Sequence, residues 1–251
     1  MTRQALVKLV WVQIKLFLRE PVAFFFTLAF PPMLLLLFGA AFGNEIDPAY
    51  NTEYGFIDYY TPALMALIAG TVGLMSVPVK TASERETGVL KRFQATPLKA
   101  ETVMMADLLT HLGINLLSAL FTTLTGYLVY DLALPQRPMA VLGAVVLGAL
   151  GFAGFGYLLA ALLPTARAAQ IAGSALFFPM MFLSGASIPL EMLPSWLQRV
   201  AEVLPMTRMV HLVTGLWLWP ESQGLVRDAL LLAVMAVIGL VAAGRLFRWS
   251  G

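Results

Sequence analysis

The chain has 251 residues, of which 59% are apolar and only 12% are charged. Soluble domains have roughly 45–50% apolar and about 25% charged residues, so a fold surrounded by water is excluded and a membrane protein is predicted. The net charge is +2, and the basic residues are spread along the chain, which excludes a nucleic-acid-binding patch. The lack of cysteine excludes disulfides, thiolate nucleophiles and cysteine-ligated metals.

Six apolar stretches are long enough to cross a bilayer. A hydrocarbon core about 30 Å thick needs roughly 20 helical residues, and lipid offers the backbone no hydrogen-bond partners, so each stretch must be a helix. The unbroken apolar runs exclude the alternating pattern of a membrane barrel. The sequence predicts one all-α membrane domain over residues 1–251 with six transmembrane helices. The predicted spans are residues 22–42, 59–79, 103–130, 139–163, 169–189 and 225–244.

Residues 1–20 have the pattern of a helix that lies in the membrane surface. Lys8, Lys15 and Arg19 fall close together on one helical face, whereas Val10 and Ile14 occupy another. Such a helix places its cations near anionic headgroups. We therefore expect an N-terminal interfacial helix, with a simple basic anchor as the alternative.

The basic residues separate into two sets on opposite sides of the predicted spans. Cytoplasmic loops carry an excess of Lys and Arg, so the larger set predicts that both termini are cytoplasmic. Residues 44–58 agree as an outer loop, because they include four acidic residues and no basic one. The cytoplasmic set is Arg3, Lys8, Lys15, Arg19, Lys80, Arg85, Lys91, Arg92, Lys99, Arg167, Arg245 and Arg248, and the outer set is Arg137, Arg199, Arg208 and Arg227.

Residues 80–99, between the second and third spans, are the richest polar stretch and lie on the cytoplasmic side by the same rule. Ser83, Glu84 and Glu86 suit a helix N-terminus, while Lys91 and Arg92 suit the C-terminal end of its dipole. The segment is therefore predicted to form a short charged helix.

Three apolar residues, Val89, Leu90 and Phe93, lie within this segment, and Pro97 ends it. A loop that only meets solvent does not need them. A short charged helix with an exposed apolar knuckle suits docking into a groove on a soluble partner.

Asp107, His111 and Asn115 recur every four residues in the third span and form one polar stripe. An Asp at mid-span costs about 2.5–3.5 kcal/mol, so such groups usually face protein or water. The stripe is either the wall of a translocation pathway or proton relay, or a pairing of Asp107 with His111 that stabilises helix packing. One His and one Asp are too few for a metal site.

Small residues are concentrated in the fourth span, where they favour close approach of neighbouring helices. They are Gly143, Gly148, Gly151, Gly154 and Gly156.

Residues 190–224 precede the last span and consist of two short amphipathic pieces set off by Pro194 and Pro205. Trp196, Trp217 and Trp219 are expected to be interfacial aromatics. An ordinary loop lying on the outer membrane surface is one interpretation of this region.

Catalytic signatures do not occur in the sequence. No lysine follows a glycine, so there is no G-x-x-x-x-G-K-[ST] phosphate loop. Neither H-E-x-x-H nor G-x-S-x-G occurs. The chain is therefore not expected to be an enzyme or to hydrolyse ATP itself.

The sequence Glu-Arg-Glu-Thr-Gly-Val-Leu at residues 84–90, with a proline at residue 97, resembles the coupling helix of ABC-2 type permeases. The family usually has an acidic residue after the leucine, where this chain has Lys91. The resemblance extends over nearly the whole chain, because residues 182–205 are similar to the family's outer segment, which turns back through short helices. It implies re-entrant helices within residues 190–224 and a set of coupling residues. These are Glu84, Arg85, Glu86, Gly88, Val89, Leu90, Phe93 and Pro97.

The resemblance also implies a function. In the family, two six-span permeases pair, and ATP-driven closure of ATP-binding subunits moves the coupling helices. This chain would then be a permease subunit of an ABC exporter in the bacterial inner membrane, moving a hydrophobic or amphipathic substrate such as a drug, a lipid or a glycan-linked molecule. Its expected partners are an ATPase subunit, which holds ATP and Mg²⁺, a second permease, identical or not, and membrane lipids, with no cofactor in this chain.

The alternative is an ion- or proton-coupled secondary transporter that uses Asp107, His111 and Asn115. It would transport without an ATPase and would stop when the proton gradient collapses; inverted repeats would favour it, and none is evident. A membrane-embedded enzyme or assembly scaffold would need clustered polar residues at one depth in the membrane. In this sequence only the stripe of Asp107, His111 and Asn115 meets that condition.

Overall fold

The structure, a computed structural model, describes residues 3–46, 53–94, 100–187, 190 and 193–246. All regular secondary structure in these residues is helical, which confirms the all-α prediction. Segments η1 and η2 have π-helical hydrogen bonding. The elements are α1 (Arg3–Leu18), α2 (Pro21–Phe24), η1 (Phe25–Ala29), α3 (Phe30–Phe42), α4 (Phe56–Gly70), η2 (Thr71–Ser76), α5 (Val77–Glu86), α6 (Val89–Gln94), α7 (Ala100–Tyr130), α8 (Pro138–Leu162), α9 (Ala166–Leu183), α10 (Ser195–Ala201), α11 (Pro205–Leu218) and α12 (Leu225–Leu246).

Among the described residues, six helical stretches are long and apolar enough to cross a membrane, as predicted. The first consists of η1 and α3, the second of α4, η2 and α5, and the others are α7, α8, α9 and α12. Two boundaries differ clearly from the prediction. The second span continues to Glu86 instead of residue 79, and α9 ends at Leu183 instead of residue 189. The early end of α9 follows from Gly185, whose φ of 84° is left-handed and cannot continue the helix.

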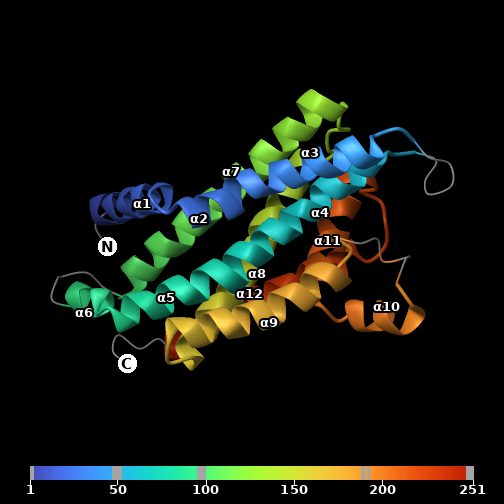
Figure 1. Ribbon diagram of the computed structural model, residues 1–251. Coiled ribbons are helices and arrows are strands. Elements are labelled where there is room, and N and C mark those ends of the chain that lie inside the picture. The colour runs from blue at the N-terminus through green and yellow to red at the C-terminus, as the bar shows by residue number, and fades with distance from the viewer. Residues whose placement is uncertain (1–2, 47–52, 95–99, 188–189, 191–192, 247–251) are drawn as a thin grey trace.

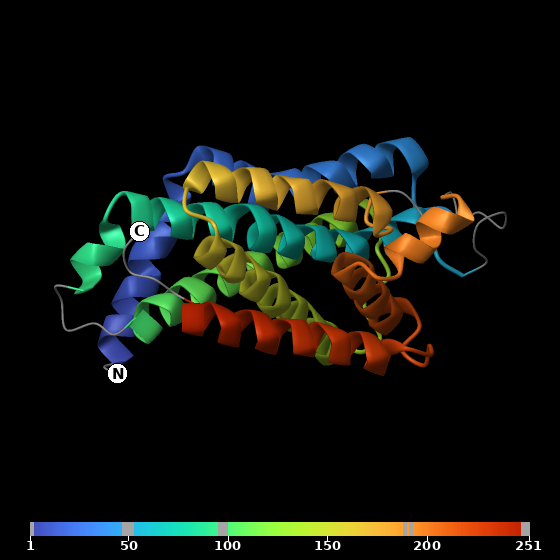
Figure 2. The same cartoon turned by 90° about the horizontal axis from the view of Figure 1, so that it is seen from below.

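The long helices run side by side along one axis (Figures 1 and 2). We call the end where α1 begins, α12 ends and α6 lies the termini end (Figure 1). The opposite end, where α10, the end of α3 and the start of α4 lie, is called the loop end. Figure 2 shows α1 turned across the direction of the long helices. It packs against α7.

Glycines bring α8 and α9 into direct contact with the backbone of η2. A Cβ atom at Gly156 would lie 1.9 Å from the Gly73 carbonyl oxygen, and one at Gly173 would lie 2.1 Å from the Leu74 carbonyl oxygen. The close approach predicted for the glycines of α8 is therefore confirmed at Gly156, as it is at Gly148, Gly151 and Gly154 against other neighbours. It is wrong for Gly143, whose Cβ position is open.

The region between α9 and α12 forms the two pieces that its prolines predict. Pro194 precedes α10 and Pro205 begins α11. α11 lies inside the bundle, against α4, α8 and α12, and its Trp217 is buried. The expectation that Trp217 is an interfacial aromatic is therefore wrong, because its indole N–H donates to the Ala133 carbonyl at 2.7 Å within the protein. Trp196, in contrast, is exposed.

Two buried carboxylates, those of Asp58 and Asp228, connect helices at the loop end. Asp58 accepts hydrogen bonds from the backbone N–H of Ala133 at 2.8 Å and of Gly55 at 3.0 Å. Asp228, at the start of α12, contacts His211 Nδ1 at 2.5 Å and Arg208 Nη1 at 3.3 Å, both on α11. The contacts of Asp58 join α4 to the connection after α7, and those of Asp228 join α12 to α11.

Candidate functional site

The segment that resembles a coupling helix is divided between two helices. Ser83, Glu84 and Glu86 belong to the last turn of α5, so the prediction that they begin a helix is wrong. The helix of the second span simply continues, because no residue between Val79 and Glu86 interrupts it. It ends where Gly88 takes a φ of 72°, and α6 then starts at Val89.

The surface of this segment is more polar than expected. Glu86, Lys91 and Arg92 are exposed and Val89 is half-buried, whereas Leu90 is only 2% exposed. The prediction of an exposed apolar knuckle is therefore wrong for Leu90, which the chain itself covers. The side chain of Phe93, within α6, and the whole of Pro97 lie outside the part of the chain that the structure describes.

Arg85, the arginine of the Glu-Arg-Glu motif, turns inward instead of facing a partner. Its side chain is buried, and Nη1 donates to the Ala160 carbonyl oxygen at 2.8 Å. Nη2 donates to the carbonyl oxygen of Leu163. The last carbonyls of a helix have no partner within it and carry the negative end of its dipole. Arg85 therefore caps α8 and joins α5 to it.

Asp107 is the centre of a buried polar cluster that lies further into the bundle than Arg85. It forms an ion pair with Lys80 of α5 and accepts a hydrogen bond of 2.5 Å from the Tyr157 hydroxyl of α8. His111 Nε2 lies 3.4 Å from the same carboxylate, and Glu84 lies 3.9 Å from Lys80. The cluster thus connects α5, α7 and α8 at one level.

Asn115 is buried one turn further along α7 and does not join this cluster. Its Nδ2 donates to the His111 carbonyl oxygen at 2.9 Å, and its Oδ1 has no hydrogen-bond partner among the described residues. The stripe continues as Ser118, whose hydroxyl donates to the Thr27 carbonyl at 2.5 Å. The predicted stripe therefore faces protein, and Asp107 joins α7 to α5 and α8, whereas the contacts of His111 and Asn115 described here lie within α7.

Sequence reasoning identified Asp107 and His111 but missed Lys80 and Tyr157. Lys80 stands four residues before Glu84, and this spacing indicates an ion pair on a helix. Nothing in the sequence around Tyr157 signals its role, because its partner lies on another helix. Within the described residues no group of three His, Cys, Asp or Glu side chains could hold a metal ion.

Comparison with known proteins identifies the family. The family model for ABC-2 type transporters matches residues 4–218. The chain is 27% identical over 202 residues to the "Probable multidrug ABC transporter permease YbhR" of Escherichia coli (strain K12), a match covering 79% of this chain and 54% of that protein. It is 27% identical over 225 residues to the "Putative transport permease ycf38" of Cyanophora paradoxa, covering 86% and 76%. It is 23% identical over 177 residues to the "Putative transport permease YvfS" of Bacillus subtilis (strain 168), covering 70% and 71%.

The chain thus spans about half the length of YbhR. Because the family model covers most of the chain and six of its helices can cross a membrane, the protein is a multi-pass membrane protein of the ABC-2 type transporter family.

Proposed function

We propose that this chain is the membrane-spanning permease of an ABC exporter whose ATP is hydrolysed by a separate subunit. The observation that carries the proposal is the α5–α6 segment, because it projects at the termini end and is fixed to two other spanning helices. Three relatives are named as permeases, and this chain contains no phosphate loop that could hold ATP and Mg²⁺.

The surface of the segment suits contact with a soluble subunit. Glu86 is exposed at the end of α5, and Lys91 and Arg92 are exposed on α6, so both charge signs are presented within a few residues. Charges of this kind set the register and specificity of an interface. Val89 supplies apolar surface beside them.

The contacts behind the segment explain how a push on α6 would reach the spans. Lys80 and Arg85 lie on the same helix as Glu86 and fasten it to Asp107 of α7 and to the last carbonyls of α8. A displacement of α5 therefore moves the ends of three helices together. ATP binding on the partner would then favour one arrangement of the bundle over another through its contacts with this segment.

The membrane orientation belongs to the same proposal. The proposed orientation has the termini end in the cytoplasm of a bacterial cell and α1 on the inner membrane surface, and the excess of basic residues on that side of the predicted spans, twelve against four, supports it. Many large apolar side chains of α7 and α12 are exposed, including Leu128 and Val226, which suits contact with lipid and with a second permease chain. The transported substrate is hydrophobic or amphipathic.

Site-specific photocrosslinking tests the proposal. The chain has no cysteine, so a single Lys91→Cys variant can carry a benzophenone label at one place on α6. Glu202→Cys, at the exposed C-cap of α10, is the matched control at the loop end. After membrane extraction in mild detergent, we expect an adduct between position 91 and an ATP-binding subunit and none from position 202. Absence of the adduct at position 91, or equal labelling from both positions, contradicts the proposal.

A further inference from the structure

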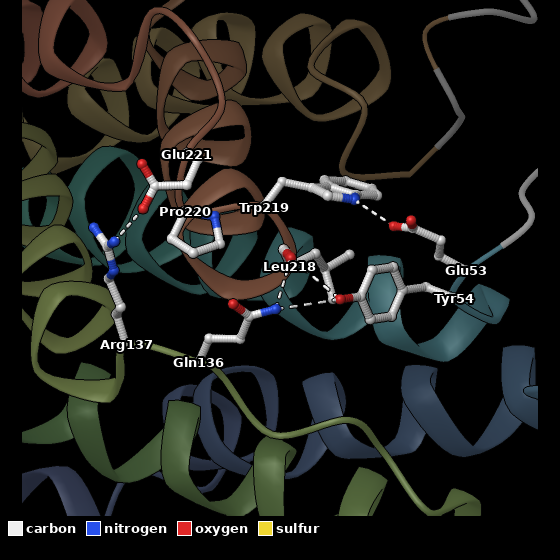
Figure 3. Close-up of a pocket in the computed structure, with 8 residues that line it drawn as sticks. All are labelled: Glu53, Tyr54, Gln136, Arg137, Leu218, Trp219, Pro220 and Glu221. Atoms are coloured by element: carbon white, nitrogen blue, oxygen red, sulfur yellow. Dashed lines mark hydrogen bonds and ion pairs between the residues drawn. The ribbon is translucent and has the colours of Figure 1, made fainter.

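A cavity of about 640 Å³ opens at the loop end (Figure 3). It lies between the residues that precede α4, those that precede α8 and those that follow α11. Figure 3 shows its main polar and aromatic side chains, which are Glu53, Tyr54, Gln136, Arg137, Trp219 and Glu221. Cavities that bind small molecules have volumes of about 300–1,000 Å³, so this one has a suitable size.

One wall of the cavity is aromatic and held in place. The Trp219 ring lies 5.5 Å from the Tyr54 ring in an edge-to-face arrangement and 5.1 Å from the Tyr59 ring. Its indole N–H donates to the Glu53 carboxylate at 3.1 Å, and the Tyr54 hydroxyl donates to the Leu218 carbonyl at 3.2 Å. The rings are therefore positioned before any ligand arrives.

Carboxylates dominate the charge around this wall. A second cavity of about 480 Å³ shares Glu53 and Tyr54 with the first and adds Glu45, Asp58 and Asp131 without a basic residue. Among the described residues that line the two cavities Arg137 is the one basic residue, and it forms an ion pair with Glu221 at the exposed rim. Backbone N–H groups donate to Asp58, and the five carboxylates against one arginine among the described lining residues give the paired cavities a negative field.

We propose that the paired cavities at the loop end bind an organic cation with a large apolar body. The aromatic wall attracts a cation through the faces of its rings and also covers apolar surface. The carboxylates favour a positive ligand over a neutral or negative one of the same shape. The assignment deepens the proposed export function by naming a substrate class, and it places that substrate at the side opposite the α6 segment.

Two ions of nearly equal shape and opposite charge test the assignment. The purified chain in phosphatidylcholine nanodiscs is titrated with radiolabelled tetraphenylphosphonium or tetraphenylborate, and binding to empty nanodiscs is subtracted. We expect saturable binding of the phosphonium and none of the borate. Glu53→Gln and Trp219→Leu should each weaken phosphonium binding about tenfold, the effect of losing one such contact. Arg137→Gln, which removes the one basic group, should strengthen it.

Matched controls separate this site from general effects. Glu202→Gln and Trp196→Leu remove an exposed carboxylate and an exposed indole that line neither cavity, so binding should be unchanged. Thermal unfolding of each variant identifies any that fails to fold, and Glu53→Gln and Arg137→Gln keep the test decisive if Trp219→Leu does not fold.

Lack of saturable phosphonium binding, equal binding of the borate, or unchanged binding in Glu53→Gln would overturn the assignment. The titration uses the chain without its ATPase. A negative result therefore leaves the photocrosslinking result intact, and a failure of the crosslink leaves the cation site intact.

Discussion

Arg85 Nη1 donates a hydrogen bond of 2.8 Å to the carbonyl oxygen of Ala160, across 75 positions of sequence. The motif that resembles a coupling helix therefore has two sides. Its glutamate at position 86 faces outward, whereas its arginine holds the end of α8. The same few residues can contact a partner and transmit the contact to a spanning helix.

Replacing Arg85 by Met should destabilise the folded chain by about 2–3 kcal/mol, because charged donors to buried carbonyls contribute about this much and their loss leaves the end of α8 without partners. Arg92→Met removes an exposed arginine from the same segment and should change stability by less than about 0.5 kcal/mol. Unfolding of both variants in one detergent provides the measurement. Equal losses would show that Arg85 does not act as a cap.

Lys80 and Asp107 should be energetically coupled. Lys80→Met leaves a buried carboxylate without its ion-pair partner, while Asp107→Asn removes the charge that needs one. In a double-mutant cycle the two changes should be less harmful together than the sum of their separate effects, with a coupling energy of about 1–3 kcal/mol. Denaturant unfolding of the four proteins checks this, and strictly additive effects would contradict it.

Two glycines of α8 should respond differently to one added methyl group. At Gly156 the methyl carbon would lie 1.9 Å from the Gly73 carbonyl oxygen, whereas at Gly143 it would meet no atom of another described element within 4 Å. Gly156→Ala should therefore lower the free energy of unfolding by about 1–3 kcal/mol, the usual effect of overpacking. Gly143→Ala should leave it unchanged or raise it slightly, because alanine is the better helix former. Similar effects at both positions would refute this account of the α8 contacts.

Changes in the turn between α5 and α6 should uncouple the spans from ATP hydrolysis. Gly88 has a φ of 72°, which proline cannot adopt, so Gly88→Pro should redirect α6, and Glu86→Lys should reverse an exposed charge at the contact. With the partner ATPase present, hydrolysis should continue in both variants. In both variants maleimide labelling of a cysteine at position 221 should no longer change with ATP, whereas we expect it to change in the chain without these substitutions.

Glu202→Lys is the control for that experiment, since it reverses an exposed charge at the loop end. It should keep the response of position 221 to ATP. If Gly88→Pro also keeps the response, then the turn does not carry the motion and the coupling role of the segment is lost.

The spanning helices could be predicted because each corresponds to one continuous apolar run. In lipid such a run must be helical, since only a helix satisfies all of its backbone hydrogen bonds within the segment. The spacing of Asp107 and His111 likewise predicted their shared face. The end of the second span could not be predicted in this way. The second span continues to Glu86 through polar residues that equally suit a separate helix, and the φ of Gly88 decides where it ends.

The inward position of Arg85, the burial of Leu90 and the hydrogen bond from Tyr157 to Asp107 depend on which helices lie side by side. Helix periodicity gives the face of a residue but not the neighbour of that face. Tyr157 and Asp107 are 50 positions apart, so their pairing emerges only when α7 and α8 are placed together.

The close backbone contacts of α8 and α9 with η2 limit how the second span can move. Because the backbones at Gly156 and Gly173 lie directly against the carbonyls of Gly73 and Leu74, we expect the helix to tilt about this point rather than to slide along its axis. Glu86 lies roughly 20 Å from this pivot and Phe56 roughly 25 Å on the other side, at 1.5 Å per residue. A shift of the Glu86 end is then expected to move the Phe56 end by a similar distance in the opposite direction.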